Sequence, residues 1–587
     1  MLWLGLAATA RAGDPIMPLS QVQKGMSCTG YSVVQGTDIS SFNVSIVDVV
    51  TGDAGDGTPY ILVRVSGPAV DVSGIANGFS GSPIYCPDAQ GVQRNIGAIS
   101  MGIGEYSNKL VLATPIESML SEPVQPPAGA RSDPALIRRA RPLSEPLVVS
   151  GVSSGVAAYF ARAAALGGRT LYGAPAGRPR DYPVQTLRPG SSVAVDLASG
   201  DVSAGAIGTV TYTDGPDVWA FGHSLDNAGR RSLLLQDAYV YTVVDNPLGI
   251  ADVAASYKLA APGHDLGTLT GDGQSAVTGV VGALPPTIPL RVLASRTDIR
   301  RGRTISASVV DETGVGLTTG SSPMSTIAPL AVAEADASLL DGPLPVQSGS
   351  MCLSIRVREL PSPMRFCNTY VTPGASGSSL VPYGDIVGDV SQAMMYLDDY
   401  AFAPPHITGV EIDLNLTPGL AQAYMLGARP LSRARPGGHV RLRLALARVR
   451  GATSLRTISV PVPRGLRSGP ALLLLKGTAA DASSSGPSAS LIQILTGGSS
   501  SSSGPPGLGT DNDPGPLTIG ELAQQIASIH RYDGVTGSFV PLSGSSGAGK
   551  KKKSQKPAAV PPGGLQAYRD GSLRISGTIA VPVVVGR

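Results

Sequence analysis

The sequence predicts a mainly β protein with several domains, and three observations support this prediction. Short runs rich in Val, Ile and Thr recur along the chain, and Gly and Pro separate them as turns, a pattern typical of strands. Gly and Pro account for 74 and 49 of the 587 residues, whereas aromatic residues make up only 5%. The length also exceeds what one hydrophobic core serves, so we expect about three to four domains.

The overall charge of the chain is close to neutral. The chain has 45 Lys and Arg against 42 Asp and Glu, a formal net charge of +3. A charge so close to neutral gives no electrostatic reason to expect nucleic acid or an anionic membrane as a partner. The one cluster of lysines, Lys550–Lys553, lies in Ser/Gly/Pro-rich sequence and is interpreted as part of a solvated linker.

The N-terminal residues predict export. An apolar run from Leu2 to Ala8 precedes Ala10-Arg11-Ala12, which resembles the cleavage site of a signal peptide. The basic segment that opens a signal peptide is missing, so we favour a start codon assigned too late over a short apolar end with no targeting role. No later run approaches the roughly 20 apolar residues of a membrane helix. We therefore expect a secreted or cell-envelope protein without an integral membrane segment.

The four cysteines fit an exported protein. They fall as Cys28 with Cys86 and as Cys352 with Cys367, and each pair can form a disulfide. The alternative is pairs of unbonded buried thiols. No Cys/His spacing resembles a zinc site, so we expect neither a metal nor another cofactor.

Two short segments carry the chemistry. Gly78-Phe79-Ser80-Gly81-Ser82-Pro83 places a serine between glycines, which lets the backbone turn sharply and bring its amides close to a reacting carbonyl. Ser80 needs a base, and His223 in Ala220-Phe221-Gly222-His223 follows an apolar strand whose end would present the imidazole. The other four histidines, His264, His406, His439 and His530, are interpreted as structural residues in loop-like settings. The competing interpretation of the serine segment is an ordinary glycine turn in a glycine-rich chain.

The context of Ser80 favours the chemical interpretation. Pro83-Ile84-Tyr85 leaves the turn as a strand, and Asn95–Ser100 is predicted to return as a second strand. Ser80 is therefore expected at the mouth of a β-hairpin. In that position the amides of Gly78 and Ser80 would form an oxyanion hole.

These segments resemble the serine and histidine boxes of the stage IV sporulation protein B (SpoIVB) peptidase family, which read Gly-Met-Ser-Gly-Ser-Pro and Leu-Gly-His. Further similar segments lie within residues 17–120, matching the serine half, and within 201–282, matching the histidine half. The resemblance implies a serine endopeptidase with a trypsin-like double β-barrel over residues 17 to 285, acting on a protein or peptide. Two features depart from the family. The halves stand in the opposite order, as in a circular permutation. The family carries a peptide-binding PDZ module ahead of the peptidase, and we expect no equivalent of it in the short stretch before Met17.

The triad acid is the third departure. The family's acidic position falls here in Val65-Ser66-Gly67-Pro68, with Asp71 the nearest carboxylate. Asp226, three residues after His223, is the acid we select, while Asp214 and Asp217 on the preceding turn are alternatives. A Ser–His dyad without an acid is the remaining option.

The predicted organisation also includes non-catalytic parts. A β-sandwich-like accessory domain is expected to offer a surface for a cell-envelope partner. A catalytically silent scaffold that keeps the barrels is the rival function. A third possible function is cleavage by the chain of its own linkers only.

The expected parts are a signal-peptide remnant (1–16), the serine half (17–120), a connector with a short helix (121–190), the histidine half (191–285), the accessory domain (286–480), a Ser/Gly/Pro-rich linker (481–515) and a C-terminal part with a helix, a Lys-rich linker and closing strands (516–587).

Overall fold

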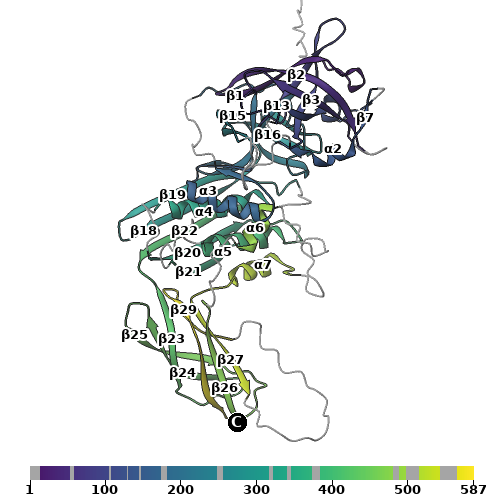
Figure 1. Cartoon of the computed structure of the whole chain (residues 1–587). Coiled ribbons are helices and arrows are strands. Elements are labelled where there is room, and N and C mark those ends of the chain that lie inside the picture. The colour runs from purple at the N-terminus through teal and green to yellow at the C-terminus, as the bar shows by residue number, and fades with distance from the viewer. Residues whose placement is uncertain are drawn as a thin grey trace, which may run out of the picture. The chain divides into compact units, whose positions relative to one another are not determined.

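The computed structural model, shown in Figure 1, forms two units. One comprises residues 1–290 with 306–331 and 489–503, and the other comprises 291–305, 332–488 and 504–587. The predicted signal-peptide remnant up to residue 12, the Lys550–Lys553 cluster and most of the 481–515 linker lie outside the described residues. The structure describes residues 13–52, 58–104, 108–127, 130–143, 147–173, 182–246, 256–315, 321–339, 346–372, 384–479, 488–496, 515–541 and 565–586.

The first unit begins with a closed six-stranded antiparallel barrel. Its strand order is β1-β4-β5-β6-β3-β2, and β2 pairs back with β1 to close it. Alternation along β2, where Phe42, Val44 and Ile46 are buried between exposed neighbours, turns one side of the strand into the barrel. The strands are β1 (Ser27–Gln35), β2 (Asp38–Thr51), β3 (Tyr60–Ser66), β4 (Pro83–Pro87), β5 (Gln93–Gly102) and β6 (Leu110–Pro115).

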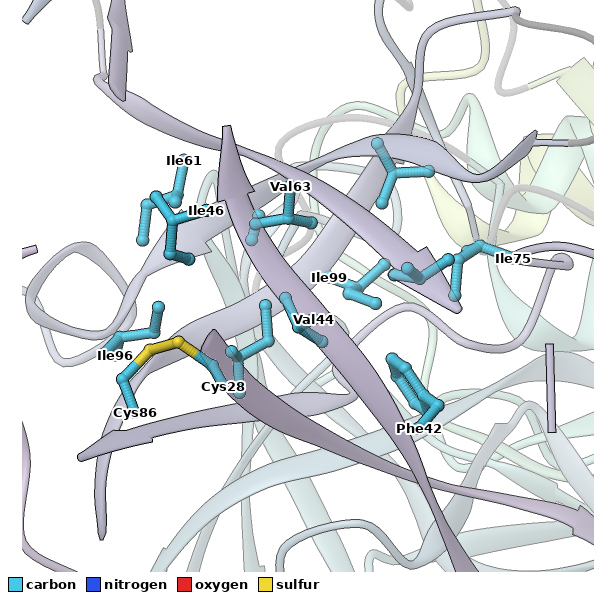
Figure 2. Packing of buried hydrophobic residues seen from close by; sticks show 14 of the residues in the cluster. Cys28, Phe42, Val44, Ile46, Ile61, Val63, Ile75, Cys86, Ile96 and Ile99 are labelled. Carbon is cyan, nitrogen blue, oxygen red and sulfur yellow. A yellow bond between two sulfur atoms is a disulfide. The ribbon is translucent and has the colours of Figure 1, made fainter. Parts of the chain in front are cut away.

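Aliphatic side chains fill this barrel around a disulfide (Figure 2). Cys28 of β1 and Cys86 of β4 are bonded and buried beside Ile96, as the figure shows. The bond ties the first strand of the barrel to the strand that leaves the Ser80 turn. The core thereby holds that turn from its C-terminal side.

A second closed barrel follows, with the order β13-β11-β15-β16-β17-β14 and closure through β14 and β13. All six pairings are antiparallel. Two barrels of six strands confirm the predicted fold class, a mainly β protein with a double β-barrel and an accessory region. The strands are β11 (Ser192–Asp196), β13 (Ser203–Asp214), β14 (Asp217–Ala220), β15 (Gly229–Val244), β16 (Tyr257–Gly273) and β17 (Ala276–Val281).

The two barrels are joined by backbone hydrogen bonds. Gly36 and Val240 exchange N–H···O bonds of 2.7 and 3.0 Å, and Asn77 donates to Ser256 at 2.7 Å. Lys258 donates its amide back to Asn77 at 2.9 Å. The segment leading into the Ser80 turn is therefore fixed to β16 of the second barrel.

Short elements flank the barrels. Helix α3 is the short helix predicted in the 121–190 connector, and Arg169 just beyond it donates to the carbonyl of Leu495 in α6 at 3.1 Å. Helix α6 lies within the predicted linker, and it is ordered because Leu491, Ile494 and Leu495 are buried. The elements are η1 (Leu19–Gln21), α1 (Ile116–Met119), β7 (Arg131–Ser132), α2 (Pro134–Arg139), β8 (Arg141–Pro142), β9 (Leu147–Ser150), α3 (Ser154–Leu166), β10 (Leu171–Gly173), β12 (Ala198–Gly200) and α6 (Ala489–Thr496).

The region after the barrels contains two helices that the sequence analysis did not predict. Helix α4 is missed because residues such as Ile327, Ala328 and Leu330 are all fully buried, which leaves no polar face to reveal a helical period. Helix α5 carries buried residues at helical spacing, Ile386, Val390 and Met394 among them. The elements are β18 (Thr287–Arg296), β19 (Arg301–Val310), α4 (Pro323–Ala337), β20 (Gln347–Val357), β21 (Met364–Thr372), α5 (Gly384–Asp398) and β22 (Ile407–Pro418).

A β-sandwich is present, but it occupies residues 422–585 instead of 286–480. Sheets β25-β24-β23-β29 and β28-β27-β26-β30 share one core, in which Leu442 and Leu444 of the first pack with Leu473 and Leu475 of the second. The C-terminal strand β30 pairs with β26. The elements are β23 (Gln422–Pro430), β24 (His439–Arg448), β25 (Thr453–Pro461), β26 (Gly469–Gly477), α7 (Ile519–Ala527), β27 (Gly534–Pro541), β28 (Leu565–Arg569), β29 (Arg574–Ser576) and β30 (Thr578–Val585).

Both predicted cysteine pairs are disulfides, with Cys352 and Cys367 joining adjacent positions of β20 and β21. Two disulfides indicate an oxidising, extracytoplasmic location. Within the described ranges, no helix combines the length and the hydropathy needed to cross a membrane.

Candidate active site

Ser80 lies in a tight turn between β3 and β4. Gly78 and Gly81 flank it with φ angles of +92° and +88°, in the left-handed region that favours glycine. Ser80 itself is fully buried. The glycines are thus required by the conformation of the turn, as the sequence predicted from their spacing.

Strand β13 of the second barrel binds the carbonyl groups of this turn. Thr209 donates its hydroxyl to the Gly78 carbonyl at 3.0 Å and its amide to the Ser80 carbonyl at 2.8 Å. Thr211, on the same face of the strand, donates its hydroxyl to the Gly81 carbonyl at 2.8 Å. The second barrel therefore fixes the orientation of the serine turn.

The amides of the turn are also bound, except that of Ser80. Gly78 donates to the Leu143 carbonyl at 2.9 Å, and Gly81 donates to the Ile99 carbonyl at 2.7 Å. Within the described residues, neither the Ser80 amide nor its buried hydroxyl has a hydrogen-bond partner. Of the two amides expected in an oxyanion hole, that of Ser80 is unoccupied and that of Gly78 is already engaged.

His223 follows β14 on a second strained turn. Phe221 and Gly222 have φ angles of +71° and +72°. The imidazole is 1% exposed, and its Nδ1 lies 2.6 Å from the Ser224 carbonyl oxygen. Because a carbonyl only accepts, Nδ1 carries the proton in the neutral ring and Nε2 is the basic nitrogen.

Burial also sets the charge of His223. Desolvation lowers its pKa to about 4, against a smaller opposing effect of the Ser224 carbonyl. The ring is therefore neutral at pH 7, which is the state a general base requires.

The serine and histidine turns are in direct contact. Gly81 of the serine turn packs directly against the backbone of the second barrel. A Cβ on Gly81 would point at the carbonyl oxygen of Thr209 and at the amide nitrogen of Phe221, in the histidine turn. On the other side, a Cβ on Gly222 would lie 3.3 Å from the Ile99 carbonyl oxygen, which accepts the Gly81 amide. The fold thus brings the two sequence-predicted segments together, although Ser80 Oγ forms no hydrogen bond with the imidazole.

We expect Gly81→Ala to separate the two turns. The added Cβ would be 2.6 Å from the Phe221 nitrogen and closer still to the Thr209 oxygen, both backbone atoms that cannot rotate away. The loss in unfolding free energy should exceed about 4 kcal/mol, beyond the usual range for a single substitution. Urea unfolding followed by tryptophan emission, to which Trp219 of β14 contributes, measures this loss.

Gly91→Ala is the matched control for that substitution. Gly91 has a φ of +81°, close to that of Gly81, but nothing lies within 4 Å of an added Cβ. It should therefore lose only the roughly 1–2 kcal/mol that a left-handed conformation costs a residue with a Cβ. Equal losses at both positions would contradict the close contact between the turns.

The structure places the predicted acid with two arginines. The Asp226 carboxylate pairs with Arg169 and lies 3.4 Å from Arg231. A different carboxylate organises the chain just after His223: buried Asp272 accepts the amides of Leu225 and Asp226 at 2.6 and 2.8 Å. The sequence gives no signal for Asp272, because it lies on β16, far along the chain from the loop that it holds.

A buried lysine was also missed. Lys258 Nζ lies 2.8 Å from Ser32 Oγ and 3.2 Å from Thr209 Oγ1, and 4.7 Å from the centre of the Phe79 ring. Its side chain packs under Gly78, whose Cβ would be 3.1 Å away. Desolvation lowers the pKa of Lys258 to about 7. Lys258 thus packs against the serine turn at Gly78 and Phe79.

His264 is not in a loop, contrary to expectation, and neither is His439, the first residue of β24. His264 lies within β16, and its Nδ1 is 2.9 Å from an oxygen of the fully buried Asp237. The Tyr182 hydroxyl donates to the same carboxylate at 2.6 Å. This carboxylate holds the segment around Tyr182 against the barrel, a structural role for His264 and its neighbours.

Two further findings concern metal binding and similarity to known proteins. Among the described residues, no group of three or more His, Cys, Asp or Glu side chains is arranged to hold a metal ion. Comparisons of the chain with family models, curated proteins and solved structures found no match. The fold is compatible with a trypsin-like peptidase on its architecture alone.

Proposed function

We propose that this chain is an exported serine endopeptidase of the SpoIVB type, with its two halves in permuted order. Ser80 is the nucleophile, His223 is the general base and then the general acid, and the Ser80 amide stabilises the oxyanion. The substrate is a protein or peptide. The double β-barrel and the contact between the two turns are compatible with this proposal.

One observation carries the proposal. Hydrogen bonds to Thr209, Thr211, Leu143 and Ile99 hold the carbonyl and amide groups around Ser80. The Ser80 amide and hydroxyl alone have no partner in the described part of this turn. A buried polar group without a partner is costly, and a catalytic role is one explanation for such a group in a folded protein.

The reaction would proceed by acyl transfer. Ser80 Oγ bonds to the scissile carbonyl carbon as its proton passes to Nε2 of His223, and the negative oxygen accepts a hydrogen bond from the Ser80 amide. His223 then protonates the leaving amine as the C–N bond breaks. Water, deprotonated by the same nitrogen, then adds to the acyl carbon; the bond to Ser80 Oγ breaks as Oγ takes the proton back from Nε2, which releases the acid and restores Ser80.

The Ser224 carbonyl would serve in place of a triad carboxylate. It fixes the proton on Nδ1 and so leaves Nε2 basic, which is the orienting task of the aspartate in a triad. A neutral carbonyl stabilises the imidazolium less than a carboxylate does. We therefore place this chain nearer the Ser–His dyad than the full triad, with Asp226 as the weaker candidate for the acid.

A catalytically silent scaffold is the second candidate, and burial favours it. Ser80 and His223 are 0% and 1% exposed, so a substrate reaches them only if the covering chain moves. In this alternative, the barrels act as a binding platform and the two turns are structural.

Hydrolysis of a mixed peptide library by the full chain distinguishes the two candidates. The peptidase predicts new peptide termini with the wild type and with Ser41→Ala, a control at an exposed serine of β2, but none with Ser80→Ala. Absence of cleavage with all three folded proteins would favour the scaffold. Cleavage that survives in Ser80→Ala would overturn the assignment of the nucleophile.

A further inference from the structure

A long stretch of sequence, from the end of β22 through the first strands of the sandwich, contains no acidic residues. From Leu414 to Ala480 there is no Asp or Glu, although the overall charge of the chain is close to neutral. The near-neutral total therefore conceals a strongly basic module. The basic residues of the stretch from 414 to 480 are Arg429, Arg433, Arg435, Arg441, Arg443, Arg448, Arg450, Arg456, Arg464, Arg467 and Lys476.

Three of these arginines gather on the outer face of one sheet, where β23, β24 and β25 lie side by side (Figure 1). Arg429 of β23 stands directly opposite Arg443 of β24, and Arg441 is two residues away on the same side. All three arginines are exposed. Along β24 its two arginines alternate with Leu442 and Leu444, which point to the opposite side of the sheet and are buried in the sandwich core. We call Arg429, Arg441 and Arg443 the arginine face.

The arginine face is not neutralised within the protein. In the described residues, no ion pair involves any of its three guanidinium groups. Like charges placed directly opposite on neighbouring strands are destabilising, so the Arg429–Arg443 pair works against the stability of the sheet. An anionic partner outside the chain would remove that repulsion.

Apolar side chains adjoin the arginine face on the same sheet. Tyr424, Leu426 and Leu455 are 47%, 62% and 61% exposed. Leu455 pairs with Ala445, which shares the outer side of β24 with Arg443, and Tyr424 pairs with Ala447 on that side. Large apolar groups beside basic ones are the pattern of a surface that enters the headgroup region of a bilayer.

We propose that this outer face docks the protein on the surface of a membrane containing anionic lipids. The arginines contact headgroup phosphates, and Leu426, Leu455 and Tyr424 enter the boundary between headgroups and acyl chains. A soluble polyanion such as nucleic acid would satisfy the arginines but would leave both leucines in water. The apolar neighbours therefore favour the lipid surface, which the chain would bind peripherally.

Vesicle co-sedimentation of the full chain tests the proposal. We expect binding to vesicles of phosphatidylcholine with phosphatidylglycerol, and little binding to phosphatidylcholine alone. Each basic residue near an anionic surface strengthens binding by a factor of about five, so the triple variant R429Q/R441Q/R443Q should bind roughly a hundredfold more weakly. Thermal unfolding of each variant checks that these exposed substitutions preserve the fold.

Two matched variants make the result specific. R291Q/R303Q/R365Q removes the same charge from exposed positions on β18, β19 and β21, and it should bind as the wild type does. L426S/L455S should weaken vesicle binding, most clearly at high salt where electrostatic attraction is screened. Three results would overturn the proposal. The first is an equal loss of vesicle binding in the two triple arginine variants, and the second is no binding of the wild type to anionic vesicles. The third is a DNA duplex that displaces the vesicles and binds L426S/L455S as tightly as it binds the wild type.

Discussion

Peptide hydrolysis is expected to fall by about four orders of magnitude when His223 is replaced by Gln, since the loss of a general base from such a site has effects of this size. Gln keeps a polar side chain of similar length beside the Ser224 carbonyl, so the fold should survive. The measurement is kcat/KM on a peptide found in the library assay. His439→Gln, at an exposed position of β24, is the control and should hydrolyse the peptide at the wild-type rate.

The pH dependence of the wild type should identify the same residue. Catalysis requires the unprotonated imidazole, and desolvation lowers the pKa of His223 to about 4. The acid limb of the kcat/KM profile should therefore have its midpoint near pH 4, and the rate should rise as pH increases through it. A midpoint near the ordinary histidine value of about 6.5 would contradict a buried, desolvated base.

Lys258→Met is expected to stabilise the protein by several kcal/mol at and below neutral pH. Lys258 is buried without a carboxylate near its Nζ in the described residues, and desolvation is the cause of its lowered pKa. A shift from 10.5 to about 7 corresponds to a destabilisation of roughly 5 kcal/mol. Met occupies a similar volume, and the Ser32 hydroxyl keeps its partner Ser82 at 3.0 Å.

The direction in which stability changes with pH distinguishes desolvation of the Lys258 ammonium from an effect of packing. The unfolded chain holds the Lys258 proton up to about pH 10.5, whereas the folded chain releases it near pH 7. The penalty is thus fully present below pH 7 and disappears as pH rises towards 10.5, so the wild type should become more stable over that interval. In Lys258→Met this rise should be lost.

Thermal unfolding followed by tryptophan emission at about pH 6 and about pH 9 measures both effects. Lys24→Met, at an exposed position, should change the unfolding free energy by less than about 0.5 kcal/mol at either pH. A Lys258→Met variant that is less stable than the wild type at pH 6 would show that the ammonium and its hydroxyl partners contribute more than its desolvation costs.

The sequence predicted what is encoded locally. The glycines beside Ser80 require a left-handed backbone, and the structure gives them φ angles of +92° and +88°. The apolar run before His223 forms β14, and alternation along β2 builds one wall of the first barrel. The spacing of the cysteines within one predicted half also indicated the Cys28–Cys86 pair.

Features created by distant pairing could not be predicted in the same way. Thr209 binds the serine turn only because β13 of the second barrel lies against the first barrel, and Asp272 reaches the loop after His223 from β16. Lys258 reads as an ordinary charged residue until the fold buries it. Helix α4 is buried along consecutive residues and so lacks the amphipathic period that would reveal it.

The boundaries of the accessory region were misplaced for a related reason. Strands from 287 to 418 and from 422 to 585 have the same Val- and Leu-rich composition, so the sequence predicts one sandwich for both sets. The last strand-like run, 573–585, is predicted to return to the preceding sandwich, and the pairing of β30 with β26 and of β29 with β23 agrees with this.

Labelling of the purified full chain with a fluorophosphonate, followed by peptide mass mapping, tests the central claim most directly. An activated Ser80 predicts one covalent adduct on the peptide containing Ser80, absent from Ser80→Ala and strongly reduced in His223→Gln. No adduct on the folded wild type, or an adduct on another serine that persists in both variants, would contradict an activated nucleophile at Ser80.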